Sequence, residues 1–386
     1  MTTLQEPTAP PTCAVVVCAY TERRWDDLRA AIASLAAQTH RAERVLLVVD
    51  HHPGLTVRAR GFFGDGVEVV ENRRRQGLSG ARNTAIDVLA EVGGLPEVVA
   101  FLDDDASARP DWLARLLAPF ADDDVVAVGG AAAPRWSAGD PRAAGGAPAV
   151  LPAELWWVVG CSFPGQTGAS AATGSRTGAG SGGDLHRTVG AGGPVEVRNV
   201  MGCSMAFRRE ALVASGGFGE DMGRVGTVPL GCEETELCLR LRRLLPGTRI
   251  VLDPDAVVDH HVSPDRTGWR YLVRRCHAEG ISKAVVTRRS GTRAGLATER
   301  AYTRHILPGA LARELRAAGT GLRRGNRPDV ARALVAAAAI PVALVAAGSG
   351  YVRGRLSRVA PALLDVVAPM VGPIGPVGPV AVEPRP

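Results

Sequence analysis

The chain has 386 residues, with 45 lysines and arginines against 39 aspartates and glutamates, and therefore a formal net charge of +6. This length allows two domains, or one large domain with appendages. Hydrophobic residues make up 46% of the sequence, which excludes an intrinsically disordered protein. Aromatic residues make up only 4%, which argues against binding of single-stranded nucleic acid by base stacking. We expect a globular protein with no nucleic-acid partner.

The cysteines and the first residues bear on the cellular compartment. Seven cysteines are scattered along the chain without a Cys-x-x-Cys pair, which argues against a structural zinc site and favours a reducing compartment. Residues 1–12 are polar and proline-rich, without the basic start and apolar core of a signal peptide, and we expect them to be disordered. The main folded part of the chain is therefore expected to face the cytosol.

Short apolar runs alternate with amphipathic stretches over the first third of the chain. Continuous apolar strands separated by helices predict an α/β fold with a doubly wound, mostly parallel sheet that is covered on both faces. Ligands of such sheets bind beyond the carboxyl ends of the strands. The strands are expected at 14–19, 44–50, 67–72, 98–102 and 125–128, and the helices at 25–38, 79–92 (with Ser79 as N-cap) and 111–120.

The second half of the chain is less regular. Residues 165–193 are mostly glycine, serine, alanine and threonine, too poor in apolar side chains to offset their ordering entropy, so we expect a flexible loop. Its formal Gly-x-Gly-x-x-Gly, which starts at Gly178, follows no predicted strand and therefore does not indicate a dinucleotide site. Patterned sequence returns at 198–240, and 257–261 predicts another strand end.

Three consecutive aspartates, Asp103, Asp104 and Asp105, follow the apolar strand Val-Val-Ala-Phe-Leu. Like charges at this density are costly unless a cation lies among them. Because Mg²⁺ and Mn²⁺ prefer carboxylates together with phosphate oxygens, we predict a metal–diphosphate site here. A second aspartate triplet, 122–124, follows a helix and precedes a strand, so we expect an acidic turn without a ligand at the opposite end of the sheet.

Other polar residues follow the first strands. Asp50 closes the second strand and can accept hydrogen bonds from a base or ribose. Tyr20, Thr21 and Glu22 occupy the first strand–helix turn, where backbone amides and a short side chain can meet a nucleotide. Arg82, in Gly-Leu-Ser-Gly-Ala-Arg-Asn, is expected either to contact the nucleotide or to pack in the core, and the sequence leaves both open.

Two adjacent carboxylates, Glu233 and Glu234, begin a predicted helix after Gly231. They would either satisfy the exposed amides of the helix start or supply a general base that deprotonates an acceptor hydroxyl. His260 belongs to a His-His pair at a strand end. Its imidazole can bind a metal, although the pair also suits a polar sheet edge.

Together these motifs resemble the family 2 glycosyltransferases with the GT-A fold, over roughly residues 14–283 without the glycine-rich tract. The matching elements are Cys-Ala-Tyr-Thr-Glu, Val-Val-Asp, Gly-Leu-Ser-Gly-Ala-Arg-Asn, Phe-Leu-Asp-Asp-Asp and Gly-Cys-Glu-Glu-Thr-Glu-Leu. The resemblance implies a GT-A domain at 13–285 that binds a UDP- or GDP-linked sugar donor. The implied donor-binding residues are Ala19, Tyr20, Glu22, Asp50, Arg82, Asp103 and Asp104.

The resemblance also implies a metal and a base. Mg²⁺ or Mn²⁺ would be held by Asp105, with Asp103 and His260. Glu234 would be the catalytic base, with Glu233 as its neighbour. The family usually has aspartate at the base position, so the longer glutamate leaves the choice between Glu233 and Glu234 open.

Three further stretches, 155–163, 198–205 and 275–283, resemble a membrane-associated subgroup labelled after dolichyl-phosphate-linked glucuronosyltransferases. This likeness implies inverting transfer of a sugar to a hydroxyl of a lipid-linked or cell-envelope glycan. The alternatives are a glycosyltransferase for small-molecule acceptors and a glycan- or lipid-binding scaffold without catalysis. A sugar nucleotidyltransferase would need a glycine-rich loop after the first strand, and this chain has none there.

The uncharged stretch 333–352 has about the length that a membrane-spanning helix needs, but its alanines, glycines and Pro341 make insertion marginal. Arginines flank it on both sides, which favours a helix or hairpin lying on an anionic membrane surface. A buried helix pair that packs on the catalytic domain is the alternative. We predict a helical, membrane-associated extension at 286–358 on the cytoplasmic face of the membrane, and a proline-rich tail at 359–386.

Overall fold

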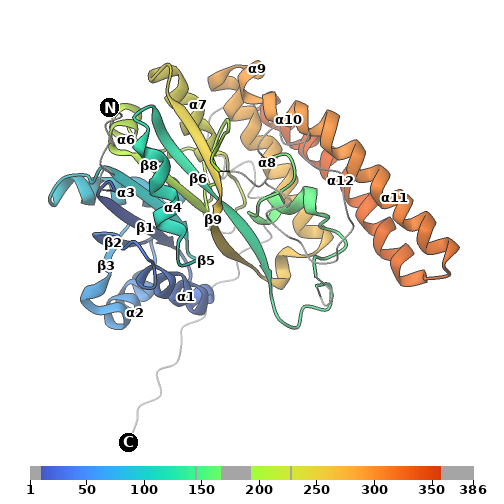
Figure 1. Cartoon of the computed structure of the whole chain (residues 1–386), viewed down its shortest axis with the longest axis horizontal. Coiled ribbons are helices and arrows are strands. Elements are labelled where there is room, and N and C mark those ends of the chain that lie inside the picture. Colours follow the sequence, from blue (N-terminus) through green and yellow to red (C-terminus); the bar gives the residue numbers. More distant parts are fainter. Residues whose placement is uncertain (1–9, 144–145, 167–192, 227, 358–386) are drawn as a thin grey trace, which may run out of the picture.

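The computed structural model describes residues 10–143, 146–166, 193–226 and 228–357. Most of the expected disordered N-terminus, nearly all of the glycine-rich tract and the proline-rich tail lie outside these residues. Within the described residues, nine strands form one mixed sheet, and helices cover both of its faces (Figure 1). The C-terminal helices lie to one side of this sheet domain.

Four parallel strands form the first half of the sheet, in the order β3-β2-β1-β4. They are β1 (Cys13–Ala19), β2 (Arg44–Val49), β3 (Glu68–Glu71) and β4 (Val98–Asp103). β1 and β4 are apolar almost throughout because helices cover them on both faces. The α/β class and the parallel order expected from the apolar runs are confirmed.

The second half of the sheet mixes strand directions. β8 (Ser204–Arg208) runs antiparallel to both β4 and β6 (Val125–Trp136), and β6 runs parallel to β9 (Arg249–Val262). The short strands β5 (Ala106–Ala108) and β7 (Val195–Glu196) pair antiparallel with β9.

β6 is much longer than the strand predicted at 125–128. The sequence did not predict the extension, because it begins with glycines and alanines, which lack the bulky side chains typical of strands. A Cβ at Gly130 would lie 2.3 Å from both the Ala256 carbonyl oxygen and the Ser204 hydroxyl, so only glycine allows this close approach.

Two hydrophobic cores lie on the two faces of the sheet. Side chains from α1 (Trp25–Ala36), α2 (Pro53–Phe63) and α4 (Trp112–Leu117) fill one core. Side chains from α3 (Leu78–Glu91), α6 (Arg209–Ser215) and α7 (Glu233–Leu244) fill the other. The sheet therefore has helices on both faces, as doubly wound folds require.

Two helix expectations need correction, and one further helix was not expected. α3 begins at Leu78 after Gly77, which has φ 127°, so Gly77 and not Ser79 is the N-cap. The Ser79 hydroxyl instead donates to the Met222 carbonyl across 2.9 Å. α4 ends at Leu117, and the chain continues as the 3₁₀ turn η3 (Ala118–Ala121), which has a proline in its first turn. α2 was not predicted, because few of its residues are buried and its apolar face is narrow.

The C-terminal helices pack on one another beside the sheet (Figure 1). α8 (Trp269–Ser290) leads through α9 (Thr292–Gly295), α10 (Ala297–Ala301) and the π-helical turn η7 (Tyr302–Ile306) into the last two helices. α11 (Leu307–Arg323) and α12 (Arg327–Leu356) form a hairpin, and α12 lies along α8.

The contact between α8 and α12 is close because glycines lie in it. A Cβ at Gly350 would come within 1.9 Å of the His277 carbonyl oxygen, and a Cβ at Gly280 within 2.0 Å of the Ala347 carbonyl oxygen. Among the described helices, α12 alone is long and apolar enough to cross a membrane by length and composition, and 39% of its most apolar window is buried. The alanine-rich stretch thus has one face packed on α8 and another face open.

Candidate active site

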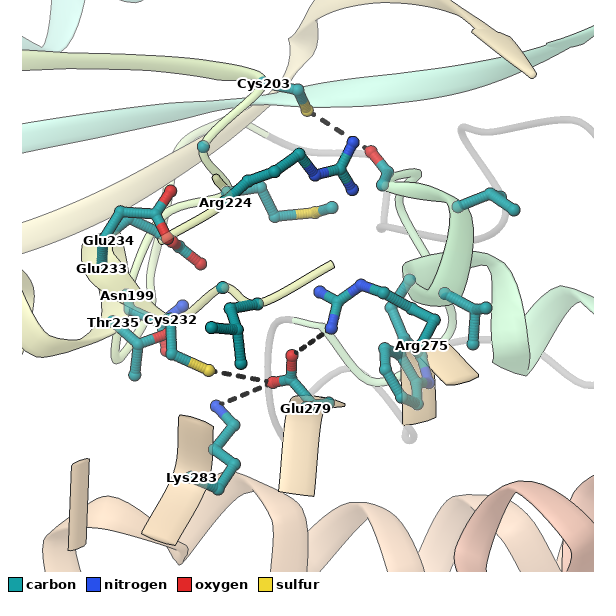
Figure 2. Close-up of a pocket in the computed structure, with 18 of the residues that line it drawn as sticks. Asn199, Cys203, Arg224, Cys232, Glu233, Glu234, Thr235, Arg275, Glu279 and Lys283 are labelled. Carbon is teal, nitrogen blue, oxygen red and sulfur yellow. Dashed lines mark hydrogen bonds and ion pairs between the residues drawn. The ribbon is translucent and has the colours of Figure 1, made fainter. Parts of the chain in front are cut away.

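A cavity of about 570 Å³ lies between the strand ends and the C-terminal helices. Its walls come from the ends of β1 and β4, the start of α7, the turn η4 (Ala153–Val159), and α8, α10 and α12. Polar side chains from the start of α7 and from α8 point into the space (Figure 2). The cavity therefore lies beyond the carboxyl ends of the parallel strands, where such sheets bind ligands.

The first aspartate triplet lies at the end of β4, as predicted, and a histidine from β9 lies beside it. β5 pairs with β9 so that Ala106 faces His260, which brings the His260 Nε2 within 3.2 Å of the Asp105 Oδ1. One ligand atom each from Asp103, Asp105 and His260 lie within 4.8 Å of one another. Two carboxylates and an imidazole are a donor set that can hold a divalent cation.

Two arginines hold the buried part of the triplet. The Arg24 Nη1 lies 2.7 Å from the Asp104 Oδ1 and 3.1 Å from the Asp105 Oδ2, and the Arg266 Nη1 lies 3.1 Å from the Asp105 Oδ2. The sequence did not single out these arginines, because nothing in the local pattern shows which arginines turn inward.

The two buried aspartates differ in their tendency to ionise. Burial dominates at Asp104 and raises the pKa of its carboxyl. Burial also opposes ionisation of Asp105, but His260 and Arg24 outweigh it and hold the pKa of Asp105 well below its usual range. The Asp104 Oδ2 is buried and has no hydrogen-bond partner among the described residues, so a ligand hydroxyl or a cation would satisfy it.

Asp50 and the first turn form another part of the cavity wall. Ala19, Tyr20 and Asp50 line the cavity. The Asp50 carboxylate accepts hydrogen bonds from the Asn72 side-chain amide across 2.7 Å and from the Gly77 backbone amide across 3.0 Å. The structure does not bring Glu22 to the cavity. Its carboxylate lies 3.3 Å from Arg58 of α2 instead.

Arg82 is buried between the two acidic parts of the site. Its Nη1 lies 2.9 Å from the Glu233 Oε1, and its Nη2 lies 2.9 Å from the Gly202 carbonyl oxygen and 3.5 Å from the Asp103 Oδ1. Its guanidinium also lies over the Phe218 ring, 5.2 Å from the centroid. Arg82 is therefore packed in the core, as one of the two expectations has it. It also lines the cavity, and its contact with the nucleotide stays a prediction.

Glu233 and Glu234 are the first two residues of α7, and both lie on the same wall of the cavity (Figure 2). Glu233 is held by Arg82. Glu234 is partly exposed to the cavity and forms no side-chain hydrogen bond or ion pair with any described residue. Burial, with Glu233 nearby, raises the pKa of Glu234 to about 8. Glu234 is therefore the carboxylate of this pair that is available to a substrate.

The facing wall carries a half-buried ionic network that the sequence reasoning missed (Figure 2). The Arg275 Nη1 lies 2.7 Å from the Glu279 Oε2, and Lys283 contacts both Glu279 and Glu299, at 3.5 and 2.8 Å. The i,i+4 spacing of Arg275, Glu279 and Lys283 places them on one helix face, which is the signal that could have found them.

Arg224 also faces the cavity (Figure 2). Its side chain makes no hydrogen bond or ion pair with any described residue, although its charge contributes to lowering the pKa of Asp105. It is thus a cation that is available to an anionic ligand.

Comparisons with known proteins identify the family. Residues 14–149 match the model of glycosyl transferase family 2. A glucosyl-dolichyl phosphate glucuronosyltransferase from Haloferax volcanii is 30% identical over 276 residues, which cover 71% of this chain and 76% of the relative. The chain therefore belongs to glycosyltransferase family 2 and is a glycosyltransferase. Its mixed α/β sheet, with helices on both faces, is the GT-A fold that the motifs implied.

Two solved structures are also similar. One is GalNAc-T7 with UDP, GalNAc and Mn²⁺, with 17% identity and a TM-score of 0.42. The match covers 66% of this chain and 43% of that chain, so it spans less than half of that structure. The other is the mannosyltransferase PcManGT from Pyrobaculum calidifontis in complex with GDP-Man and Mn²⁺, with 19% identity and a TM-score of 0.48 over 89% of this chain and 90% of that chain. Similarities this distant carry no further conclusion about this chain.

Proposed function

We propose that the chain is a metal-dependent, inverting glycosyltransferase that moves a sugar from a UDP- or GDP-linked donor to a hydroxyl of a lipid-linked acceptor. The observation that carries the proposal is that the group of Asp103, Asp105 and His260 and the unpaired Glu234 line one cavity. Arg82 contacts both sides, through Asp103 and Glu233.

The proposed cofactor is Mn²⁺ or Mg²⁺, held by Asp103, Asp105 and His260. When bound, the ion would offset the charge of the leaving diphosphate, which is Lewis-acid help of several kcal/mol. The donor set supports this assignment, because both ions accept carboxylate ligands and Mn²⁺ also accepts imidazole.

The donor would bind with its nucleoside at the first strand ends, against Ala19, Tyr20 and Asp50, which all line the cavity. Asp103 and Asp104 would contact the ribose or the diphosphate beside them. Arg224 would approach the diphosphate, because it is a cation without an ion-pair partner among the described residues. Arg82 would act by holding Asp103 and Glu233 in place, since its guanidinium contacts both.

Glu234 would be the general base. Its carboxylate would take the proton from the acceptor hydroxyl, a contribution of roughly 10²–10⁴-fold in rate. The deprotonated oxygen would attack the anomeric carbon from the face opposite the diphosphate, so the anomeric configuration would be inverted. Glu233 is less suited to this role because Arg82 already binds it.

Two observations support a lipid-linked acceptor. The relative from Haloferax volcanii is named for a glucosyl-dolichyl phosphate substrate. The cavity also extends to α12, where Ala343, Leu344 and Ala347 line it next to the helix surface. We propose that the α11–α12 hairpin rests on a membrane surface and that the cavity opens to an acceptor held there.

The proposed location is the cytoplasmic face of that membrane. All seven cysteines are free thiols, six of them buried, which supports a reducing compartment.

A transfer assay tests the proposed function. The full chain would be incubated with Mn²⁺ and UDP-glucuronate, UDP-glucose or GDP-mannose, with polyprenyl-phosphate glucose or a soluble aryl glucoside as acceptor. We expect transfer to the lipid-linked acceptor from one of the donors, loss of transfer with EDTA, and a product of inverted configuration by NMR. Equal use of the soluble glucoside would favour a small-molecule acceptor. Donor binding without transfer to either acceptor would favour the non-catalytic scaffold.

A further inference from the structure

The residue directly before the glutamate pair has an unusual backbone conformation. Cys232 has φ 70° and ψ 12°, in the left-handed region that favours glycine. Among the described residues, one other non-glycine residue has a positive φ, His51. Strained residues of this kind persist where the surroundings hold them, and they concentrate at functional sites.

Two hydrogen bonds from this turn reach α8. The Cys232 thiol donates to the Glu279 Oε1 across 3.1 Å, and the Gly231 backbone amide donates to the Ser282 hydroxyl across 3.2 Å (Figure 2 shows the first). Cys232 is also buried, with 3% of its surface exposed, and Glu279 is the side-chain acceptor that its thiol reaches. The turn is thus tied to the facing wall of the cavity.

The acceptor of the thiol hydrogen bond is itself fixed. Arg275 and Lys283, one turn before and one turn after Glu279 on α8, contact its carboxylate at 2.7 and 3.5 Å. α8 is held in turn by its close glycine contacts with α12. Glu279 is therefore a rigid charged acceptor, and hydrogen bonds to a charged group are stronger than those between neutral groups.

The conformation of Cys232 sets the direction in which α7 begins, because Cys232 is the N-cap of that helix. Arg82 fixes the side chain of Glu233, but no described residue fixes that of Glu234. The position of Glu234 therefore depends on the backbone that carries it. We propose that Cys232 is a positioning residue, whose thiol hydrogen bond to Glu279 holds the strained turn that presents Glu234 to the acceptor hydroxyl. This inference rests on the proposed role of Glu234 as base.

Substitution by glycine separates positioning from stability. Cys232→Gly removes the thiol and relieves the backbone strain, so we expect a melting temperature close to that of the wild type. Because glycine adopts positive and negative φ about equally, nothing then holds the turn in the one conformation that presents Glu234. We expect kcat to fall at least about ten-fold, because small misplacements of a catalytic group cost rate steeply, while the donor KM stays within two-fold. Cys232→Ser keeps a donor for Glu279 and should retain kcat within three-fold.

Cys238→Ala is the matched control, since Cys238 is a buried thiol on the same helix that does not line the cavity. It should lower the melting temperature and leave kcat within two-fold. Full activity of Cys232→Gly would overturn the proposal, and so would a serine variant as impaired as the glycine variant.

The position of Glu234 in crystal structures tests the role of Cys232 independently of the proposed function. Crystal structures of the wild type, Cys232→Ser and Cys232→Gly would show the Glu234 carboxylate in one position in the first two and displaced in the third. An unmoved Glu234 in Cys232→Gly would contradict the positioning role whether or not any donor is turned over. If Glu234 is displaced in Cys232→Gly and the wild type transfers no sugar, the positioning role of Cys232 is supported and the proposed function is contradicted.

Discussion

Arg82 and Glu233 form a buried ion pair, with 2.9 Å between the Arg82 Nη1 and the Glu233 Oε1 and both side chains at most 5% exposed. The same guanidinium lies 3.5 Å from the Asp103 Oδ1. One α3 side chain thus contacts both the acidic end of β4 and the start of α7. This arrangement explains how two acidic motifs, about 130 residues apart in sequence, are kept at one cavity.

Removing Arg82 should destabilise the fold strongly. Breaking a buried pair from one side leaves an uncompensated charge, which costs about 3–5 kcal/mol, so Arg82→Met should lower the free energy of unfolding by about this amount. Arg74→Met is the control, because Arg74 also contacts two carboxylates, Asp87 and Glu220, but is 41% exposed. It should cost about 1 kcal/mol or less. Denaturant unfolding measures both, and similar losses would contradict the assigned importance of the buried pair.

The two glutamates should respond differently to substitution. Glu234→Gln keeps the shape of the side chain and removes the proton acceptor, so we expect transfer to fall by roughly 10²–10⁴-fold while nucleotide affinity stays within a few-fold. Glu233→Gln should weaken the contact with Arg82 and lower stability, with a smaller effect on the rate. Single-turnover kinetics and calorimetric titration with the nucleotide separate these effects. An active Glu234→Gln beside an inactive Glu233→Gln would exchange the two roles.

The raised pKa of Glu234 predicts a pH dependence of stability. The folded state favours the protonated carboxyl up to about pH 8, whereas the unfolded chain ionises near its ordinary pKa of 4.5. The wild type should therefore lose stability relative to Glu234→Gln as the pH rises through this window, and the difference should level off above it. Melting temperatures from pH 4 to pH 9 measure the difference. Transfer should rise over the same upper range because the base must be ionised, and a pH-independent gap between the two proteins would contradict the raised pKa.

The two aspartate triplets provide a matched pair for the metal site. Asp105→Asn should weaken donor binding and remove the stabilisation by Mn²⁺ in a thermal-shift titration, because it removes one proposed metal ligand. Asp123→Asn should change neither, since Asp123 is fully exposed and its contact with Arg208, at 3.8 Å, lies at the other end of the sheet. Circular dichroism would show that both variants are folded. Equal losses in the two variants would refute the site assignment.

The sequence predicts those features of the fold and the site that depend on neighbouring residues in the chain. The parallel strands could be predicted because strands buried on both faces are continuous apolar runs, and Asp50 and Asp105 could be placed because they follow such runs. The extension of β6 could not be predicted, because its glycines and alanines allow close backbone contacts and lack the large apolar side chains that indicate a strand.

The ion-pair partners of the acidic residues also could not be predicted from the sequence. Arg24 and Arg266 contact Asp105 across long sequence separations, and an arginine-rich chain gives no sign of which arginines turn inward. The expectation that Glu22 binds the donor was not supported by its position. Glu22 lies in the first strand–helix turn, but its side chain points toward Arg58 of α2.

The last prediction concerns the outer face of α12. Leu334, Val345, Val352 and Leu356 are 49%, 71%, 57% and 75% exposed. Their spacings of 11, 7 and 4 residues place them on one side of a helix with 3.6 residues per turn, so they form an apolar stripe along α12. The exposed arginines Arg323, Arg324 and Arg327 lie where α11 meets α12. An apolar stripe next to basic residues is the pattern of a helix that lies in an anionic membrane surface.

Replacing three residues of the stripe tests this contact without disturbing the face of α12 that packs on α8. The variant Val345→Gln/Val352→Gln/Leu356→Gln should bind vesicles containing phosphatidylglycerol at least about five-fold less than the wild type in a flotation assay, because it removes apolar area that the bilayer would bury. Its melting temperature should stay close to that of the wild type, since exposed substitutions usually change stability by less than about 0.5 kcal/mol. Val57→Gln/Val213→Gln is the control, because these valines are 72% and 65% exposed on α2 and α6 of the sheet domain. A wild type that does not float with the vesicles, or a stripe variant that floats equally well, would show that α12 serves only to pack on α8.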